Sequence, residues 1–334
     1  MSESDVVSGI EIRPMSERPK SVGRSWHLPA DFFFHKAAVF AAFLVAGVLF
    51  ATIIAIAFDS RTSIHAFGIW KFLKSSEWNP VTQTFGAFPF IIGTLVSSAI
   101  AMVLGVPISF GVAVFIAEIA PVWIKRPVAA AIELLAAIPS IVYGLWGLLI
   151  FAPVFARAEP WINDKLGAIP GIGLLFQGPP MGIGMLTAGI VLAIMVLPYM
   201  SSIMRDVFLV VPSSLRESAY AMGATTWEVA WNIILPYTRT AVIGGIFLGL
   251  GRALGETMAV TFVIGNSNTL SSSFLMPGAT IPSVLANEFT EATTKLYVSS
   301  LIYLGLILIA VTLIVRFLAV LLIRRLGRRE GAAA

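Results

Sequence analysis

The chain has 334 residues, of which 57% are hydrophobic and 12% are charged, and this charged share is far below the roughly 25% of an ordinary soluble domain. The composition excludes a soluble globular protein, a disordered chain and a nucleic-acid-binding tail, because long uncharged runs fill the sequence. The formal net charge is only +4, so we expect no nucleic acid to bind. Most of the chain is therefore expected to lie in lipid.

Catalytic and metal-binding patterns are missing from the sequence. There is no cysteine, which excludes disulfides, thiolate metal sites and cysteine nucleophiles. His27, His35 and His65 form no HExxH motif, and no GxxxxGK[ST] motif occurs. We therefore expect no catalytic residue, no metal site and no cofactor bound by this chain. If ATP is used, another subunit must bind it.

Six segments are long and apolar enough to cross about 30 Å of hydrocarbon, which predicts an all-α integral membrane protein with six transmembrane helices. The predicted spans are Ala37–Phe58, Phe88–Ala117, Pro127–Phe155, Met181–Met204, Ala241–Gly265 and Leu296–Ile323. The first is too long for the apolar part of a signal peptide, so we expect it to be retained. The second is long enough to need a tilt or a break, and Pro107 is the expected place for a break.

The distribution of lysine and arginine predicts the orientation. With the N-terminal tail placed inside, the inside segments hold Arg13, Arg18, Lys20, Arg24, Lys36, Lys125, Arg126, Arg205, Arg216, Arg239, Arg324, Arg325, Arg328 and Arg329. The outside segments hold only Arg61, Lys71, Lys74, Arg157, Lys165 and Lys295. Because basic residues concentrate on the cytoplasmic side, both termini are predicted to be cytoplasmic. The expected organisation is a tail at 1–34, a transmembrane domain at 35–323 and a second tail at 324–334.

The inside loop at 205–239 is the connection that looks folded. The capping-box spacings Ser214–Glu217 and Thr225–Glu228 predict the starts of two short helices. Gly223 is placed to end the first helix, and the second is expected to run until Leu235–Pro236. The first helix would present Leu215, Ala219 and Met222 as an apolar face at the membrane surface.

This loop resembles the EAA loop of ABC-transporter permeases. The matching positions are Glu217, Ala219, Gly223, Ile233, Leu235 and Pro236, with Ser218 where the pattern has alanine. The resemblance implies that the loop forms coupling helices, which dock on an ATP-hydrolysing subunit and pass its movement to the spans. On the residues alone, a helix pair that merely lies on the lipid headgroups stays open as an alternative.

The fifth span places Arg252 and Glu256 near the middle of the membrane, where each charge costs about 2.5–3.5 kcal/mol. Their i, i+4 spacing puts both on one helix face, where they can pair. A guanidinium can bind a tetrahedral oxyanion through two parallel hydrogen bonds, and a carboxylate can accept a proton-bearing oxygen, which favours phosphate over sulfate. An inert ion pair is the alternative. Thr257 and Thr261 are weaker pathway candidates, because threonine commonly bonds its own helix.

Backbone features of two spans also predict local structure. The spacings Gly245-x3-Gly249 and Gly251-x3-Gly255 indicate close helix packing. Pro139 is expected to break the third span. Near it, Glu133 fits a gate about as well as a side chain that snorkels to the cytoplasmic surface.

Three longer segments extend the resemblance to the whole chain from about residue 35. They are IPSIVYG at 138–144, GLGRALGETMAVTFVIGN at 249–266 and LMPGATIPSVLANEF at 275–289, and they are similar to the permease subunits of phosphate-specific ABC importers. The resemblance implies a type I importer fold in a bacterial inner membrane, with Arg252 and Glu256 in the substrate pathway. It also implies a heterodimer with a second permease, two ATP-binding subunits that use ATP and Mg²⁺, and an extracytoplasmic phosphate-binding protein.

Other functions stay open at this point. One is an ABC permease for another oxyanion, such as sulfate or molybdate. Another is a secondary transporter or channel without an ATPase partner, although the sequence shows no convincing repeated halves. The outside segment Thr280–Phe289 is expected to form a helix, which could receive a binding protein or could be an ordinary interfacial helix.

Overall fold

The computed structural model describes the backbone of residues 29–331 and the side chains of residues 32–325. Within the described backbone there are helices and two isolated β-bridges but no strand. The tail expected at 1–34 lies almost wholly outside the described residues. The chain divides into two units, Met1–Ile54 and Ala55–Ala334, and each is described by itself.

Six helical segments within residues 32–325 are long and apolar enough to cross a membrane, as predicted. They are Phe32–Asp59, Phe88–Ile119, Ser140–Leu166, Met185–Leu209, Thr226–Leu254 and Lys295–Arg325. Four of them match the predicted spans with small shifts at the ends. The third and the fifth differ from the prediction in where the helix breaks.

The first unit consists, where it is described, of most of helix α1 (Pro29–Asp59). Its large apolar side chains are exposed along its length; they include Phe33, Phe43, Leu49 and Phe50. A helix that is apolar on every side is typical of a segment surrounded by lipid or by other membrane helices.

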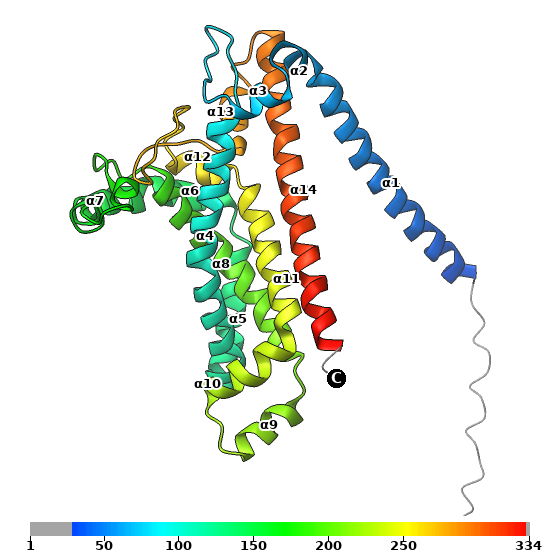
Figure 1. The fold of residues 1–334 in the computed structure, drawn as a ribbon. Helices are drawn as coiled ribbons and strands as arrows, with labels where there is room; N and C mark the ends of the chain where they lie inside the picture. The colour runs from blue at the N-terminus through cyan, green and yellow to red at the C-terminus, as the bar shows by residue number, and fades with distance from the viewer. Residues whose placement is uncertain (1–28, 332–334) are drawn as a thin grey trace, which may run out of the picture. The chain divides into compact units, whose positions relative to one another are not determined.

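The second unit is built around α8 (Met185–Leu209), which is the most buried of the six membrane-length helices. It packs against α4 (Phe88–Val114), α5 (Val122–Ala136) and α11 (Leu235–Leu254) (Figure 1). The backbones approach closely because glycines face side chains across these contacts. A Cβ at Gly189 would lie 2.5 Å from Ile100 of α4, and one at Gly249 would lie 2.5 Å from Met200 of α8.

The expected break at Pro107 is wrong, because α4 continues through this proline to Val114. Packing against α8 holds the helix on both sides of it: Gly105 lies against Met200, and Ser109 Oγ donates to the carbonyl of Leu197 at 3.2 Å. A proline removes only one helical hydrogen bond. The irregular turn comes later, as the π-helix η1 (Phe115–Ile119).

The segment predicted as the third span is not one continuous helix. The break expected at Pro139 is confirmed. Helix α5 ends at Ala136, and α6 (Ser140–Trp146) begins directly after the proline. The Tyr143 hydroxyl donates to the carbonyl of Leu135 at 2.9 Å, which links the two sides of the break. The helix then continues through η2 (Gly147–Phe151) into α7 (Ala152–Leu166).

The fifth predicted span is also displaced. Its helical segments are α10 (Thr226–Val229), the π-helix η4 (Ala230–Ile234), α11 and α12 (Met258–Val263). The first three form one membrane-length helix that begins in the predicted inside loop and ends at Leu254. The residues that follow Leu254 were expected to continue this helix, but α12 is a separate element.

The two ends of the second unit carry different short elements. The loop end, defined by residues 205–239, carries α9 (Ser213–Ala221) and α10. The cap end, defined by residues 60–88 and 266–295, carries α2 (Arg61–Phe67), α3 (Ile69–Lys74) and α13 (Ile281–Glu288). The turn η3 (Gly173–Phe176) precedes α8, and α14 (Lys295–Gly331) follows α13. Figure 1 shows the two ends on opposite sides of the bundle.

Candidate functional site

The loop end contains the two short helices that the sequence predicted, and Gly223 ends the first one. Its φ is +88°, in the left-handed region that favours glycine. The Gly223 N–H donates to Tyr220 O at 2.9 Å, and the Ala224 N–H donates to Ala219 O at 3.1 Å. This pair of bonds is the Schellman arrangement. The predicted stop signal is therefore confirmed in both position and geometry.

Only one of the two predicted capping boxes forms. Thr225 Oγ1 accepts the N–H of Glu228 at 3.3 Å, and the Glu228 carboxylate accepts the N–H of Thr225 at 2.7 Å. The box at Ser214–Glu217 is wrong. Helix α9 already begins at Ser213, directly after Pro212, with no side-chain cap. Ser214 is thus inside the first turn, where its side chain cannot act as an N-cap.

The expected helix stop at Leu235–Pro236 is also wrong. Pro236 lies in the first turn of α11, and the helix runs straight into it from η4. At the junction the Leu235 N–H donates five residues back, to Ala230 O. A π-helical turn shifts the hydrogen-bond register, so the missing N–H of the proline can be accommodated without ending the helix.

Helix α9 turns a different face toward the bundle than expected. Ala219 is buried against the bundle, whereas Leu215 and Met222 are 43% and 82% exposed, so the three residues do not form one buried face and a face at the membrane surface stays a prediction. The second inward side chain is Arg216, whose Nη1 lies 3.0 Å from Oε1 of Glu118 on η1. Leu215, Glu217 and Met222 are exposed on or directly after α9.

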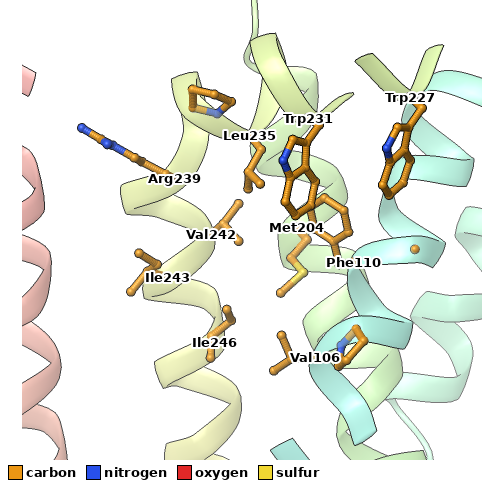
Figure 2. A pocket seen from close by; sticks show the side chains of 13 residues that line it. Val106, Phe110, Met204, Trp227, Trp231, Leu235, Arg239, Val242, Ile243 and Ile246 are labelled. Carbon is orange, nitrogen blue, oxygen red and sulfur yellow. The ribbon is translucent and has the colours of Figure 1, made fainter. Parts of the chain in front are cut away.

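An apolar groove of about 790 Å³ lies beside this loop, between α4, α8, η4 and α11 (Figure 2). Trp227 and Trp231 stack at its edge, with ring centroids 5.7 Å apart. Leu235 and Pro236, two of the positions that match the EAA pattern, line the groove. A third, Ile233, packs against the buried residues of the loop end. These three positions therefore shape the base of the loop.

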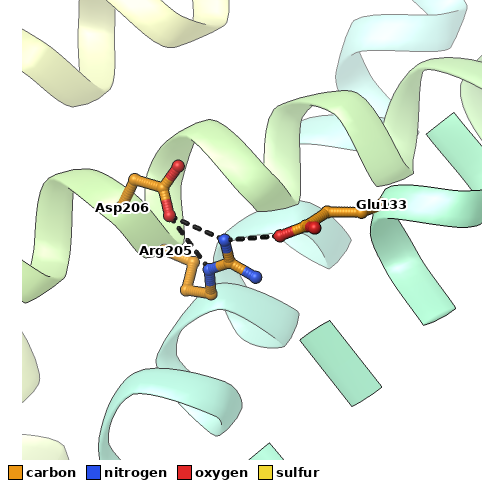
Figure 3. A network of polar contacts seen from close by, with 3 residues as sticks. All are labelled: Glu133, Arg205 and Asp206. Carbon is orange, nitrogen blue, oxygen red and sulfur yellow. Dashed lines mark hydrogen bonds and ion pairs between the residues drawn. The ribbon is translucent and has the colours of Figure 1, made fainter. Parts of the chain in front are cut away.

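A polar network joins α5 to α8 at the same end (Figure 3). Arg205 lies 2.9 Å from Glu133 and 2.8 Å from Asp206, and both carboxylates are more than half exposed. Glu133, whose role the sequence left open, is thus one partner of an ion pair near the surface. Such pairs contribute little to stability.

The charged part of the fifth span lies at a helix break. Helix α11 ends at Leu254, two residues after Arg252, and α12 begins two residues after Glu256. The predicted pairing is wrong: no N···O contact within 4.0 Å joins the two side chains in the described structure. The i, i+4 geometry requires a continuous helix, and the chain turns at Gly255.

Each of the two charged side chains has a different neighbour. The Arg252 guanidinium carbon lies 5.2 Å from the ring centroid of Tyr199 on α8, within cation–π range. Glu256 Oε1 accepts the N–H of Ala259 at 3.3 Å and so satisfies a backbone group at the start of α12. Thr261 Oγ1 donates to Thr257 O at 2.7 Å, the within-helix bond expected of it.

Two of the motifs that carried the resemblance meet in space. Helix α6, from the segment at 138–144, crosses α12, from the segment at 249–266. Gly144 makes the crossing possible, since a Cβ there would lie 2.8 Å from the Phe262 ring and 3.0 Å from Ala259 Cα. The helix that follows the break at Pro139 therefore packs against the helix that follows the turn at Gly255.

The third motif forms part of the cap end. Helix α13 begins at Ile281 with a capping box between Thr280 and Ser283, and its first turn is buried. At its C-terminal end, Glu288 accepts hydrogen bonds from Trp78 Nε1 at 2.6 Å and from the Tyr297 hydroxyl at 2.7 Å. The expected helix is confirmed, but it is anchored into the cap rather than lying free on the membrane.

The sequence reasoning missed two charged residues. Glu118 escaped notice because its partner Arg216 is remote in the sequence. Arg316 lies within the sixth span, at a groove that Phe247 and Gly251 of α11 also line. The sequence could have indicated Arg316, because it and Arg252 are the basic residues that the predicted topology places in neither the inside nor the outside segments.

Comparison with known proteins places the chain in a family. Residues 105–328 match the family described as binding-protein-dependent transport system inner membrane component. The chain belongs to this family. Like the phosphate-importer permeases it resembles in sequence, it is therefore a multi-pass membrane component of a transport system and not the ATP-hydrolysing enzyme.

Relatives within this transport family are similar over most of their length. The phosphate transport system permease protein PstC of Xylella fastidiosa (strain 9a5c) is 55% identical over 303 residues, covering 90% of this chain and 93% of the relative. The protein of the same name from Pasteurella multocida (strain Pm70) is 50% identical over 306 residues, covering 91% and 95%. A solved bacterial alginate ABC transporter, in complex with its alginate pentasaccharide-bound periplasmic protein, matches with a TM-score of 0.59 at 15% identity. That match covers 87% of this chain and 93% of the other. This likeness shows the fold of an ABC importer permease.

Proposed function

We propose that this chain is the membrane-spanning permease subunit of an ATP-driven importer that moves inorganic phosphate into the cytoplasm. The observation that carries the proposal is Arg252: a guanidinium in a membrane span, at the break between α11 and α12, with no carboxylate within 4.0 Å in the described structure. A guanidinium binds a tetrahedral oxyanion in a planar, two-bond geometry. The names of the relatives support phosphate as that anion.

The proposed assembly has the partners that such an importer needs. A second permease completes the pathway, two ATP-binding subunits use ATP and Mg²⁺, and an extracytoplasmic binding protein delivers phosphate. The chain itself binds no cofactor in this proposal. The loop end is assigned to the cytoplasm, where the outer side of α9 faces an ATP-binding subunit, and both termini are on that side.

The pathway step is assigned to Arg252 and Glu256, with Thr257 and Thr261 in weaker roles. Glu256 accepts the N–H of Ala259 in the first turn of α12. A contact between Glu256 and a protonated phosphate oxygen would therefore also affect the start of this helix. Arg252 remains available for the anion while the ring of Tyr199 holds it in place. Glu217, Ala219, Gly223, Ile233, Leu235 and Pro236 form the coupling loop in this proposal.

Transport by the purified complex in proteoliposomes tests the function. We expect uptake of labelled phosphate to require ATP inside the vesicles and the binding protein outside, and to resist excess sulfate or molybdate. Uptake that persists without ATP and collapses with an ion gradient would identify a secondary transporter. Inhibition by sulfate or molybdate at equal concentration would indicate an ABC permease for another oxyanion.

A further inference from the structure

One guanidinium connects three elements at the loop end. Arg216 of α9 lies 3.0 Å from Glu118 of η1, measured between Nη1 and Oε1, and its Nη2 donates to the backbone carbonyl of Phe208 on α8. The side chains of Arg216 and Glu118 are only 17% and 5% exposed. Helix α9 is therefore fixed to the ends of α4 and α8 by a largely buried ion pair.

The other ion pair at this end provides a comparison. Glu133 lies 2.9 Å from Arg205, but its side chain is 59% exposed. Exposed pairs contribute little to stability, whereas removing one partner of a buried pair leaves an uncompensated charge. The buried pair is therefore the specific side-chain connection between α9 and η1, and Ala219 is the buried residue of α9.

Glu118 also occupies an unusual backbone. It lies in the π-helical turn η1 at the end of α4, and π-turns occur frequently at functional sites. From η1, α4 reaches the opposite end of the molecule. There Thr94 Oγ1 accepts the backbone N–H of Ile281 at 3.0 Å, which ties α4 to α13. One helix thus links the coupling loop to the cap.

We propose that the Glu118–Arg216 ion pair is the connection through which a displacement of α9 moves α4 and, through Thr94, the start of α13. Neither side chain touches the cargo, so both are positioning residues. The inference rests on the proposed function, in which α9 is displaced by an ATP-binding subunit. Without the pair, a smaller part of the displacement of α9 would reach α4.

The test uses the full complex in proteoliposomes and measures phosphate taken up per ATP hydrolysed. For Glu118→Gln we expect this ratio to fall by about fivefold or more, the lower limit of a typical coupling energy, while ATP hydrolysis per assembled complex stays near the wild-type rate. Exchanging the charges, with Glu118→Arg and Arg216→Glu together, should recover part of the ratio. The matched control Glu133→Gln should leave the ratio unchanged.

The possible outcomes separate the inference from the function. A ratio of uptake to ATP hydrolysis that is unchanged in assembled Glu118→Gln complex overturns the inference. If Glu118→Gln does not assemble, Arg216→Lys decides by the same ratio, because it keeps the charge but lacks the two separate nitrogens that reach Glu118 and the Phe208 carbonyl. If the wild-type complex takes up no phosphate, the proposed function itself fails.

Discussion

Gly144 of α6 lies against Ala259 of α12, so closely that a Cβ on the glycine would be 3.0 Å from the Ala259 Cα. We predict that Gly144→Ala lowers the stability of the permease by about 1–3 kcal/mol, because overpacking forces neighbouring backbone to shift. The melting temperature of the detergent-purified chain measures this. Gly111→Ala is the control, since nothing lies within 4 Å of its Cβ position. Equal melting temperatures for the two variants would contradict the close approach.

Arg252→Gln is predicted to abolish phosphate uptake while membrane insertion and assembly persist. The amide has no charge and cannot form the paired bonds that a guanidinium offers an oxyanion. Arg252→Lys should also transport poorly, since an ammonium is a point charge without a planar fork. Uptake in vesicles, normalised to assembled complex, is the measurement. Wild-type uptake in Arg252→Gln would remove the arginine from the pathway.

Gly223→Val is predicted to disturb the turn between α9 and α10. A β-branched residue at φ +88° is strained by about 1–2 kcal/mol, so the Schellman bonds should weaken and ATP hydrolysis should become uncoupled from transport. Gly223→Asn is the matched control, because asparagine tolerates the left-handed region. The ratio of uptake to hydrolysis compares the two. A normal ratio of uptake to hydrolysis in the valine variant would indicate that the loop is a surface helix pair without a role in coupling.

The two candidate capping residues should respond differently to alanine. Thr225→Ala is expected to destabilise the start of α10 by about 1 kcal/mol, because the N-cap hydrogen bond is lost. Ser214→Ala should have almost no effect, since α9 has no side-chain cap. Amide hydrogen exchange at residues 226–230 and 213–217 measures the local stability. Faster exchange in the Ser214 variant alone would reverse the assignment.

The carboxylate of Glu288 is predicted to hold the cap end together. It accepts bonds from Trp78, Tyr297 and Asn268, so Glu288→Ala leaves three donors unpaired, each at a cost of about 1–3 kcal/mol. We expect a clear drop in melting temperature. Glu291→Gln, at a neighbouring exposed position, should not change it. Similar melting temperatures in both variants would mean that water replaces the carboxylate.

Relationships within one or two helical turns were predictable from the sequence. The number of spans, the stop at Gly223 and the capping box at Thr225 all depend on neighbours a few positions away, and each was confirmed. The box at Ser214 failed because α9 begins two residues earlier than that cap requires, with Pro212 at the N-cap position. The resemblance at the coupling loop and in the fifth span also led to the right family, since short spacings carry it.

Contacts between remote segments were decided by the tertiary structure. The long apolar runs in the sequence established a membrane protein with helical spans, because such runs are stable in lipid and a helix satisfies its own backbone hydrogen bonds there. The sequence could not place the break after Arg252, which depends on how α12 packs on Gly144, nor could it pair Glu118 with Arg216. A charge within a sequence shows only that a partner is needed; which partner it meets is fixed when the helices pack and exclude the others.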